Sequence, residues 1–70
     1  MNIDCAKKII HQNIGVFHHF VYYGSRNQKE EFDGVISEAY PAIFIIRLNN
    51  GSIRSFSYGD YIIHHIEIVS

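Results

Sequence analysis

The chain has 70 residues, 47% hydrophobic and 14% aromatic, and it carries six basic and seven acidic side chains. This composition argues against disorder, and the formal charge of −1 excludes the broad basic surface typical of non-specific nucleic-acid binding. One cysteine excludes an internal disulfide and a cysteine-based zinc site within one chain. With no long apolar run, we expect a cytoplasmic protein that does not enter the membrane.

The first segment, residues 2–12, predicts the only helix of the chain. Asn2 or Asp4 can accept hydrogen bonds from the free N–H groups of the first turn. Asn13 and Gly15 then tolerate a left-handed exit from the helix. The apolar face of this helix holds Ile3, Ala6, Ile9 and Ile10.

Five strands are expected after the helix, at residues 16–23, 29–40, 42–48, 52–58 and 62–69. Gly34 permits a sharp bend or bulge inside the second strand. Pro41 ends that strand because proline has no N–H to donate. Asn50 and Gly51 predict a hairpin between the third and fourth strands, since both residues accept a positive φ.

This order of elements predicts a mostly β fold in one domain, residues 1–70. Residues 1–14 form the N-terminal α-helix and its cap, and residues 15–70 form a small five-stranded barrel of the SH3-like (Sm-like) type. Closing the sheet removes exposed strand edges. An OB-fold is the main alternative, but it needs a helix between strands three and four, where this chain has only a hairpin.

A set of motif residues in the centre and toward the end of the chain resembles the Veg family of small bacterial proteins. In chain order the set is Asn13, Ile14, Gly15, Gly24, Arg26, Gly34, Glu38, Tyr40, Pro41, Ala42, Ile43, Phe44, Ser57, Tyr58 and Asp60. The resemblance implies an SH3-like barrel with a cytoplasmic role in stimulating biofilm formation. It also implies action on gene regulation through a transcriptional repressor, with no enzymatic activity assigned.

The first strand carries large apolar groups on both faces, so the face turned away from the core needs a cover. The leading helix is one candidate cover, and a homodimer or another protein is the second. We prefer an interaction surface formed by Phe17, Val21 and Tyr23. The predicted function is therefore a non-catalytic module that binds a protein partner, such as a transcriptional regulator, and forms a homodimer.

Nucleic-acid binding is the alternative function. It would use the 24–29 loop, and its candidate phosphate contacts are Lys7, Arg26, Lys29 and Arg54. Several acidic residues are expected to lie near these charges, which makes an ordinary mixed-charge surface the stronger interpretation.

Two histidine pairs raise the question of a metal site. His18-His19 lies in the first strand and His64-His65 in the last, and a barrel makes these strands neighbours. One histidine of each pair, with Glu67, has the residue types that bind zinc or nickel. Ordinary surface or core histidines are the stronger interpretation, with pH sensing as a further option. We expect neither metal nor cofactor.

Catalytic groups are weakly indicated. Glu38 and Asp60 form a candidate carboxylate pair, but each lies where a turn or corner needs an acceptor for backbone N–H groups. Cys5, in the first helical turn, has no histidine that sequence spacing places beside it. We therefore predict that the chain is not an enzyme.

Overall fold

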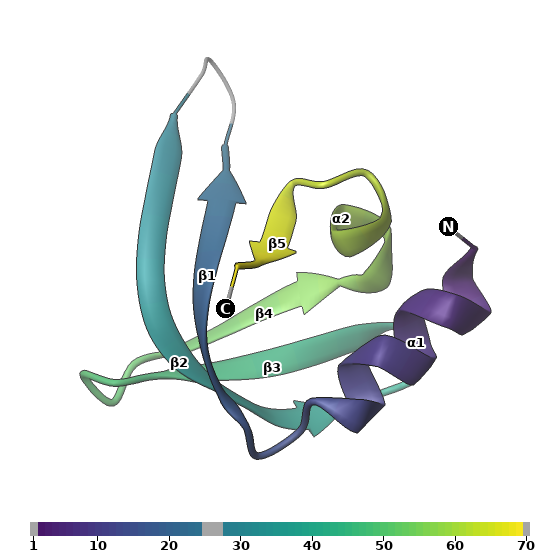
Figure 1. Ribbon diagram of the computed structural model, residues 1–70, viewed down its shortest axis with the longest axis horizontal. Coiled ribbons are helices and arrows are strands. Elements are labelled where there is room, and N and C mark those ends of the chain that lie inside the picture. Colours follow the sequence, from purple (N-terminus) through teal and green to yellow (C-terminus); the bar gives the residue numbers. More distant parts are fainter. Residues whose placement is uncertain (1, 25–27, 70) are drawn as a thin grey trace.

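The computed structural model describes residues 2–24 and 28–69, and Figure 1 shows a strongly curved sheet with two helices beside it. The elements in chain order are α1 (Ile3–Gln12), β1 (Phe17–Tyr23), β2 (Lys29–Ala39), β3 (Ile43–Leu48), β4 (Ile53–Ser57), α2 (Tyr58–Ile62) and β5 (Ile66–Ile68).

All five strands belong to one antiparallel sheet in the order β4-β3-β2-β1-β5. The first and last strands are thus neighbours, and α2 joins the two strands at the edges of the sheet. Figure 1 shows the sheet curling so that β4 and β5 approach each other around α2. The predicted mostly β fold, with five strands in one sheet and an N-terminal helix, is confirmed.

The curvature is concentrated in β2, the longest strand. A Cβ atom at Gly34 would lie 2.4 Å from the carbonyl oxygen of Arg47, so only glycine permits this approach of β2 to β3. A bulge between Ile36 and Glu38 shifts the register of the same two strands. These two features allow one long strand to serve both sides of the curled sheet.

The concave face of the sheet forms the core, together with one face of α1 and the start of α2. The buried cluster is aromatic and β-branched and consists of Ile10, Phe20, Ile36, Phe44, Ile46, Phe56, Tyr58 and Ile66. Neighbouring rings stack or tilt against each other at centroid distances of 5.3 to 6.1 Å, within the usual range for aromatic pairs.

The N-terminal helix begins and ends as its sequence indicates. The Asn2 side chain accepts a hydrogen bond of 2.8 Å from the Cys5 N–H, and Gly15 follows the helix with φ +84°. The helix packs chiefly against α2, with a smaller contact to β2. The alternative that α1 covers the outer face of β1 is therefore wrong.

A second helix is the main correction to the predicted elements. The chain was expected to contain one helix and a final strand at residues 62–69, whereas α2 occupies Tyr58–Ile62 and β5 only Ile66–Ile68. The Ser57 hydroxyl accepts from the Asp60 N–H at 3.1 Å, and the Asp60 carboxylate accepts from the Ser57 N–H at 3.4 Å. This reciprocal capping box starts a helix where a tight turn was predicted.

Within the part of the chain that the structure describes, neither helix is long and apolar enough to cross a membrane.

Candidate interaction surface

The convex face of the sheet carries a row of side chains that runs across four strands. Register places Phe17 opposite Val35, Val35 opposite Arg47, and Arg47 opposite Ile53. Because alternate residues of a strand point to opposite faces, all four lie on the face turned away from buried Phe20 and Ile36. We call these four residues the outer row.

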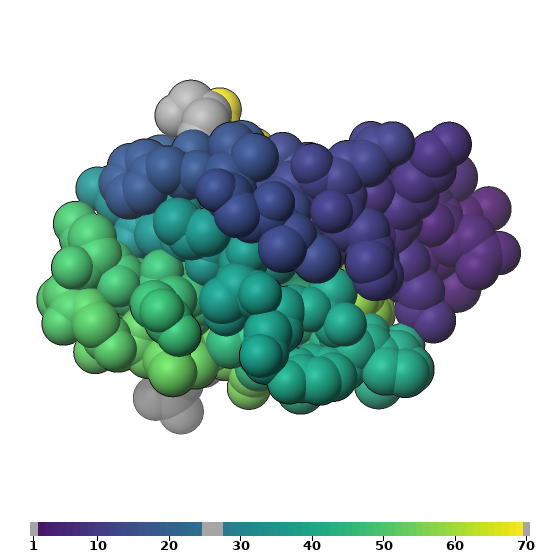
Figure 2. Space-filling view, turned by 90° about the horizontal axis from the view of Figure 1, so that it is seen from below, coloured from purple at the N-terminus to yellow at the C-terminus, as the bar shows by residue number. Residues whose placement is uncertain are grey.

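The two ends of the outer row are among the most exposed large apolar side chains of the protein. Phe17 is 60% exposed and Ile53 is 62% exposed. Arg47, between them, is exposed and makes no ion pair with any described residue. Figure 2 looks onto the molecule from below and shows blue residues of β1, teal residues of β2 and β3, and green residues of the β3–β4 hairpin adjoining.

The predicted interaction residues Phe17, Val21 and Tyr23 do share the convex face of β1, but they differ in exposure. Tyr23 is 39% exposed, whereas Val21 is only 5% exposed and does not offer a contact surface. Val21 lies between its register partners Glu31 on β2 and Glu67 on β5. The short strand β5 pairs only with residues 20–22, so Phe17 lies beyond its cover. The expected exposure of Val21 is thus corrected.

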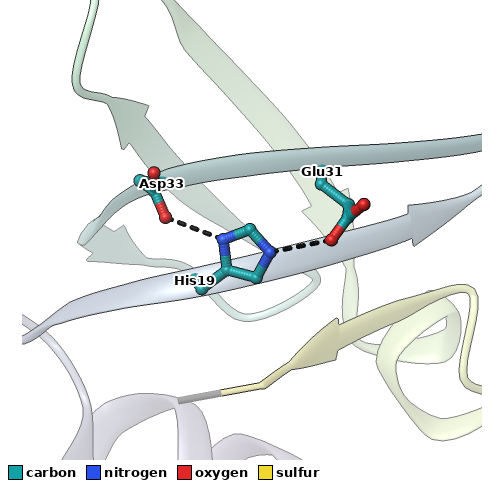
Figure 3. A network of polar contacts seen from close by, with 3 residues as sticks. All are labelled: His19, Glu31 and Asp33. Atoms are coloured by element: carbon teal, nitrogen blue, oxygen red, sulfur yellow. Dashed lines mark hydrogen bonds and ion pairs between the residues drawn. The ribbon is translucent and has the colours of Figure 1, made fainter.

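His19 lies on the same convex face, between two carboxylates of β2 (Figure 3). Its Nδ1 is 2.7 Å from Asp33 Oδ1, and its Nε2 is 3.1 Å from Glu31 Oε1. Both ring nitrogens can donate only when the imidazole is protonated. The hydrogen bond to Asp33, followed by the one to Glu31, raises the pKa of His19 above its ordinary value of 6.5.

The two histidine pairs do not come together, although their chain segments are neighbours. His64 and His65 follow α2 in a turn outside β5, and the His65 carbonyl accepts from the Tyr23 N–H, at the end of β1 opposite to His18. His18 instead contacts the Asn13 side chain at 2.8 Å. Within residues 2–24 and 28–69, no three His, Cys, Asp or Glu side chains are arranged to hold a metal ion.

The basic residues considered for nucleic-acid binding are spread over the molecule. Arg54 lies on the concave side, where its Nη1 donates to Glu30 at 2.8 Å and its Cζ is 5.2 Å from the Phe56 ring centroid. Lys7 lies on α1 with its Nζ 5.7 Å from the centroid of a core tyrosine ring. Lys29 opens β2, and Arg26 lies outside the described residues.

The central motif residues hold the chain in place at the corner between β2 and β3. The Tyr58 hydroxyl donates to the Tyr40 carbonyl oxygen at 2.7 Å, and the Tyr40 hydroxyl donates to Glu38. The contact with Glu38 raises the pKa of Tyr40, and burial raises the pKa of Tyr58. Exposed Pro41 follows the corner, and buried Phe44 packs its ring 5.6 Å from that of Tyr58.

Glu38 and Asp60 each have a local partner in the structure. Glu38 accepts from the Tyr40 hydroxyl, and Asp60 caps the N-terminus of α2. These contacts give both carboxylates structural roles and do not join them in one site.

Sequence reasoning considered Arg47 only as a possible phosphate contact, and it did not identify Val35 and Ile53 as part of a surface. The signal was present in part, because the Asn50-Gly51 turn fixes Ile53 opposite Arg47 once its hairpin register is known. The pairing of Val35 with both Phe17 and Arg47 needed the course of β2 through the bend at Gly34.

A comparison with protein-family models finds one described as "Biofilm formation stimulator VEG", which matches residues 1–69. The chain belongs to this family. The match includes every residue of the outer row and all the motif residues that suggested the resemblance. No curated protein matches this Veg-family chain.

Proposed function

We propose that this Veg-family chain is a non-catalytic interaction module that acts in biofilm regulation by binding proteins through its outer row. The observation that carries the proposal is the exposure of Phe17 and Ile53 at the two ends of one cross-strand row. Apolar side chains of this size on a regular, unpaired sheet face are typical of interaction sites. Aromatic residues and arginine are also enriched in the centres of protein interfaces.

The proposed partner is a regulator of gene expression in the cytoplasm, such as a transcriptional repressor. The family description supports a role in stimulating biofilm formation. The placement of Arg54 and Lys7 over aromatic rings of the core favours a protein partner over a nucleic acid, because their charges are already engaged inside the chain.

Affinity capture from a host extract tests the proposal, with and without nuclease treatment. We expect a defined protein to be retained after nuclease and to be lost with Phe17→Asp or Ile53→Asp. Ile63→Asp is the matched control, because Ile63 is 58% exposed but lies after α2, away from the outer row. The thermal midpoint of each variant reports whether its fold is intact.

Two outcomes contradict the proposal. Retention of the same protein by folded Phe17→Asp and Ile53→Asp variants would remove the outer row as the binding site. Loss of the captured material on nuclease treatment would assign the protein to nucleic-acid binding instead.

A further inference from the structure

We infer that a second copy of this chain covers the centre of the convex face in a two-fold symmetric contact. This inference rests on the proposed function, because it names the occupant of part of the same surface. It concerns two successive pairs on the convex face of the sheet, Val35 with Arg47 and Glu38 with Ile45. We call these four residues the outer block.

The outer block is arranged as two diagonals. Val35 and Ile45, both partly exposed and apolar, occupy one diagonal, whereas Arg47 and Glu38 occupy the other. The bulge between Ile36 and Glu38 creates this pattern, because it brings Glu38 rather than Ser37 opposite Ile45. Opposite charges therefore lie at two corners of a small apolar centre.

Neither charge of the outer block is neutralised by another described residue. Arg47 makes no ion pair, and Glu38 accepts only the neutral hydroxyl of Tyr40 in the described part of the chain. The two residues are diagonal neighbours, and such residues on adjacent strands are about 7–8 Å apart between Cα atoms. In the described part of the chain, no ion pair joins Arg47 to Glu38 across this distance. Both side chains are exposed and free to meet groups that approach from outside.

A two-fold axis along the apolar diagonal makes this pattern complementary to itself. When two copies meet face to face about that axis, Val35 and Ile45 each pack on their own counterparts. Arg47 then faces Glu38 of the second copy, and the symmetry forms the same ion pair twice. Water leaves the centre, while two opposite-charge pairs border it, which is the usual arrangement of a specific interface.

The self-complementarity favours a second copy over an unrelated protein as the occupant. An unrelated partner would have to supply its own matching acid, base and apolar diagonal, whereas a second copy supplies them by symmetry. Phe17 and Ile53 lie outside the outer block, on its two flanks.

Sedimentation equilibrium with charge reversal tests the inference. We expect the wild-type chain to dimerise, and Arg47→Glu or Glu38→Arg each to weaken the dimer at least tenfold. The double variant, Arg47→Glu with Glu38→Arg, exchanges the two charges and is expected to restore dimerisation. Lys8→Glu is the matched control, because it changes the net charge as Arg47→Glu does but at an exposed position of α1.

Glu38→Gln guards against a folding defect, since it removes the charge and keeps an acceptor for the Tyr40 hydroxyl. It should also weaken the dimer. A wild-type chain that stays monomeric at about millimolar concentration would overturn the inference, because a dissociation constant above about 1 mM describes only a weak contact. So would a double variant that associates no better than the single ones.

The two proposals fail in different ways. A monomeric wild-type chain that still captures a protein through Phe17 and Ile53 keeps the proposed function and removes the dimer. A wild-type chain that dimerises but captures no protein keeps the dimer and removes the proposed function.

Discussion

The hydroxyl of buried Tyr58 donates a 2.7 Å hydrogen bond to the carbonyl oxygen of Tyr40, and so ties the start of α2 to the corner between β2 and β3. The same ring packs 5.6 Å from the Phe44 ring and lies 5.7 Å from Lys7 Nζ on α1. One side chain therefore joins both helices, the corner and the core. This contact joins a tyrosine at the start of α2 and a tyrosine at a corner 18 residues earlier in the chain into one structural unit.

Replacing Tyr58 with Phe should lower the free energy of unfolding by about 1 kcal/mol, because it removes one hydrogen bond and keeps the packed ring. Urea unfolding measures the change. Tyr61→Phe is the control, since the partly buried Tyr61 hydroxyl has no hydrogen-bond partner among the described residues. Equal losses in the two variants would contradict a specific role for the bond to Tyr40.

Replacing Gly34 with Ala should destabilise the protein by about 1–3 kcal/mol, because the new Cβ would meet the Arg47 carbonyl oxygen at 2.4 Å. Backbone atoms of a central strand cannot move aside without loss of register. Gly59→Ala provides a control in which the expected change in stability has the opposite sign. Gly59 lies in α2, its nearest contact is Ser57 Oγ at 3.5 Å, and alanine there should add about 0.5–1 kcal/mol. A Gly34→Ala variant with an unchanged free energy of unfolding would show that β2 and β3 can separate at this point.

Removing the capping box should shift the thermal midpoint downward. Ser57→Ala deletes the acceptor for the Asp60 N–H and should cost about 1 kcal/mol. Ser55→Ala on the exposed face of the same strand is expected to change stability by less than about 0.5 kcal/mol. If both variants melt alike, the start of α2 does not depend on the Ser57 cap.

His19 should make stability depend on pH in the neutral range. Its pKa is raised in the folded chain, so its stabilising contribution is fully present below the unfolded value of about 6.5. That contribution is lost as the pH rises through the higher folded pKa. The difference in unfolding free energy between the wild type and His19→Gln should therefore shrink on going from acidic to alkaline pH.

NMR titration of the His19 ring separates the two carboxylates that raise its pKa. Asp33→Asn should lower the pKa more than Glu31→Gln, because the shorter contact, 2.7 Å against 3.1 Å, goes to Asp33. The reverse order would contradict the geometry in Figure 3.

Local signals were sufficient for most of the strands and for α1. The Asn2 cap, the Asn50-Gly51 hairpin and the bend at Gly34 all act within a few residues or through one steric restriction, so they were predictable. The second helix was missed although its signal is also local. Ser57 and Asp60 have the spacing of a capping box, but the alternating residues before them favoured a longer strand and a turn.

The candidate surface was predictable only in part. Alternation correctly places Phe17, Val21 and Tyr23 on one face of β1. It cannot give their exposure, because β5 covers the centre of β1 and ends before Phe17. Nor does it reveal that Ile53, far along the chain, completes the same row.

The sequence by itself determined the class of fold, the family, and the position of nearly every strand, because periodicity, caps and turns depend on neighbours in the chain. Tertiary structure decided which exposed side chains share a surface and which charges find partners. Strand register sets these relations, and register here depends on a bulge in β2 and a glycine pressed against the Arg47 carbonyl. The same long-range pairing covers Val21 and leaves Phe17 exposed.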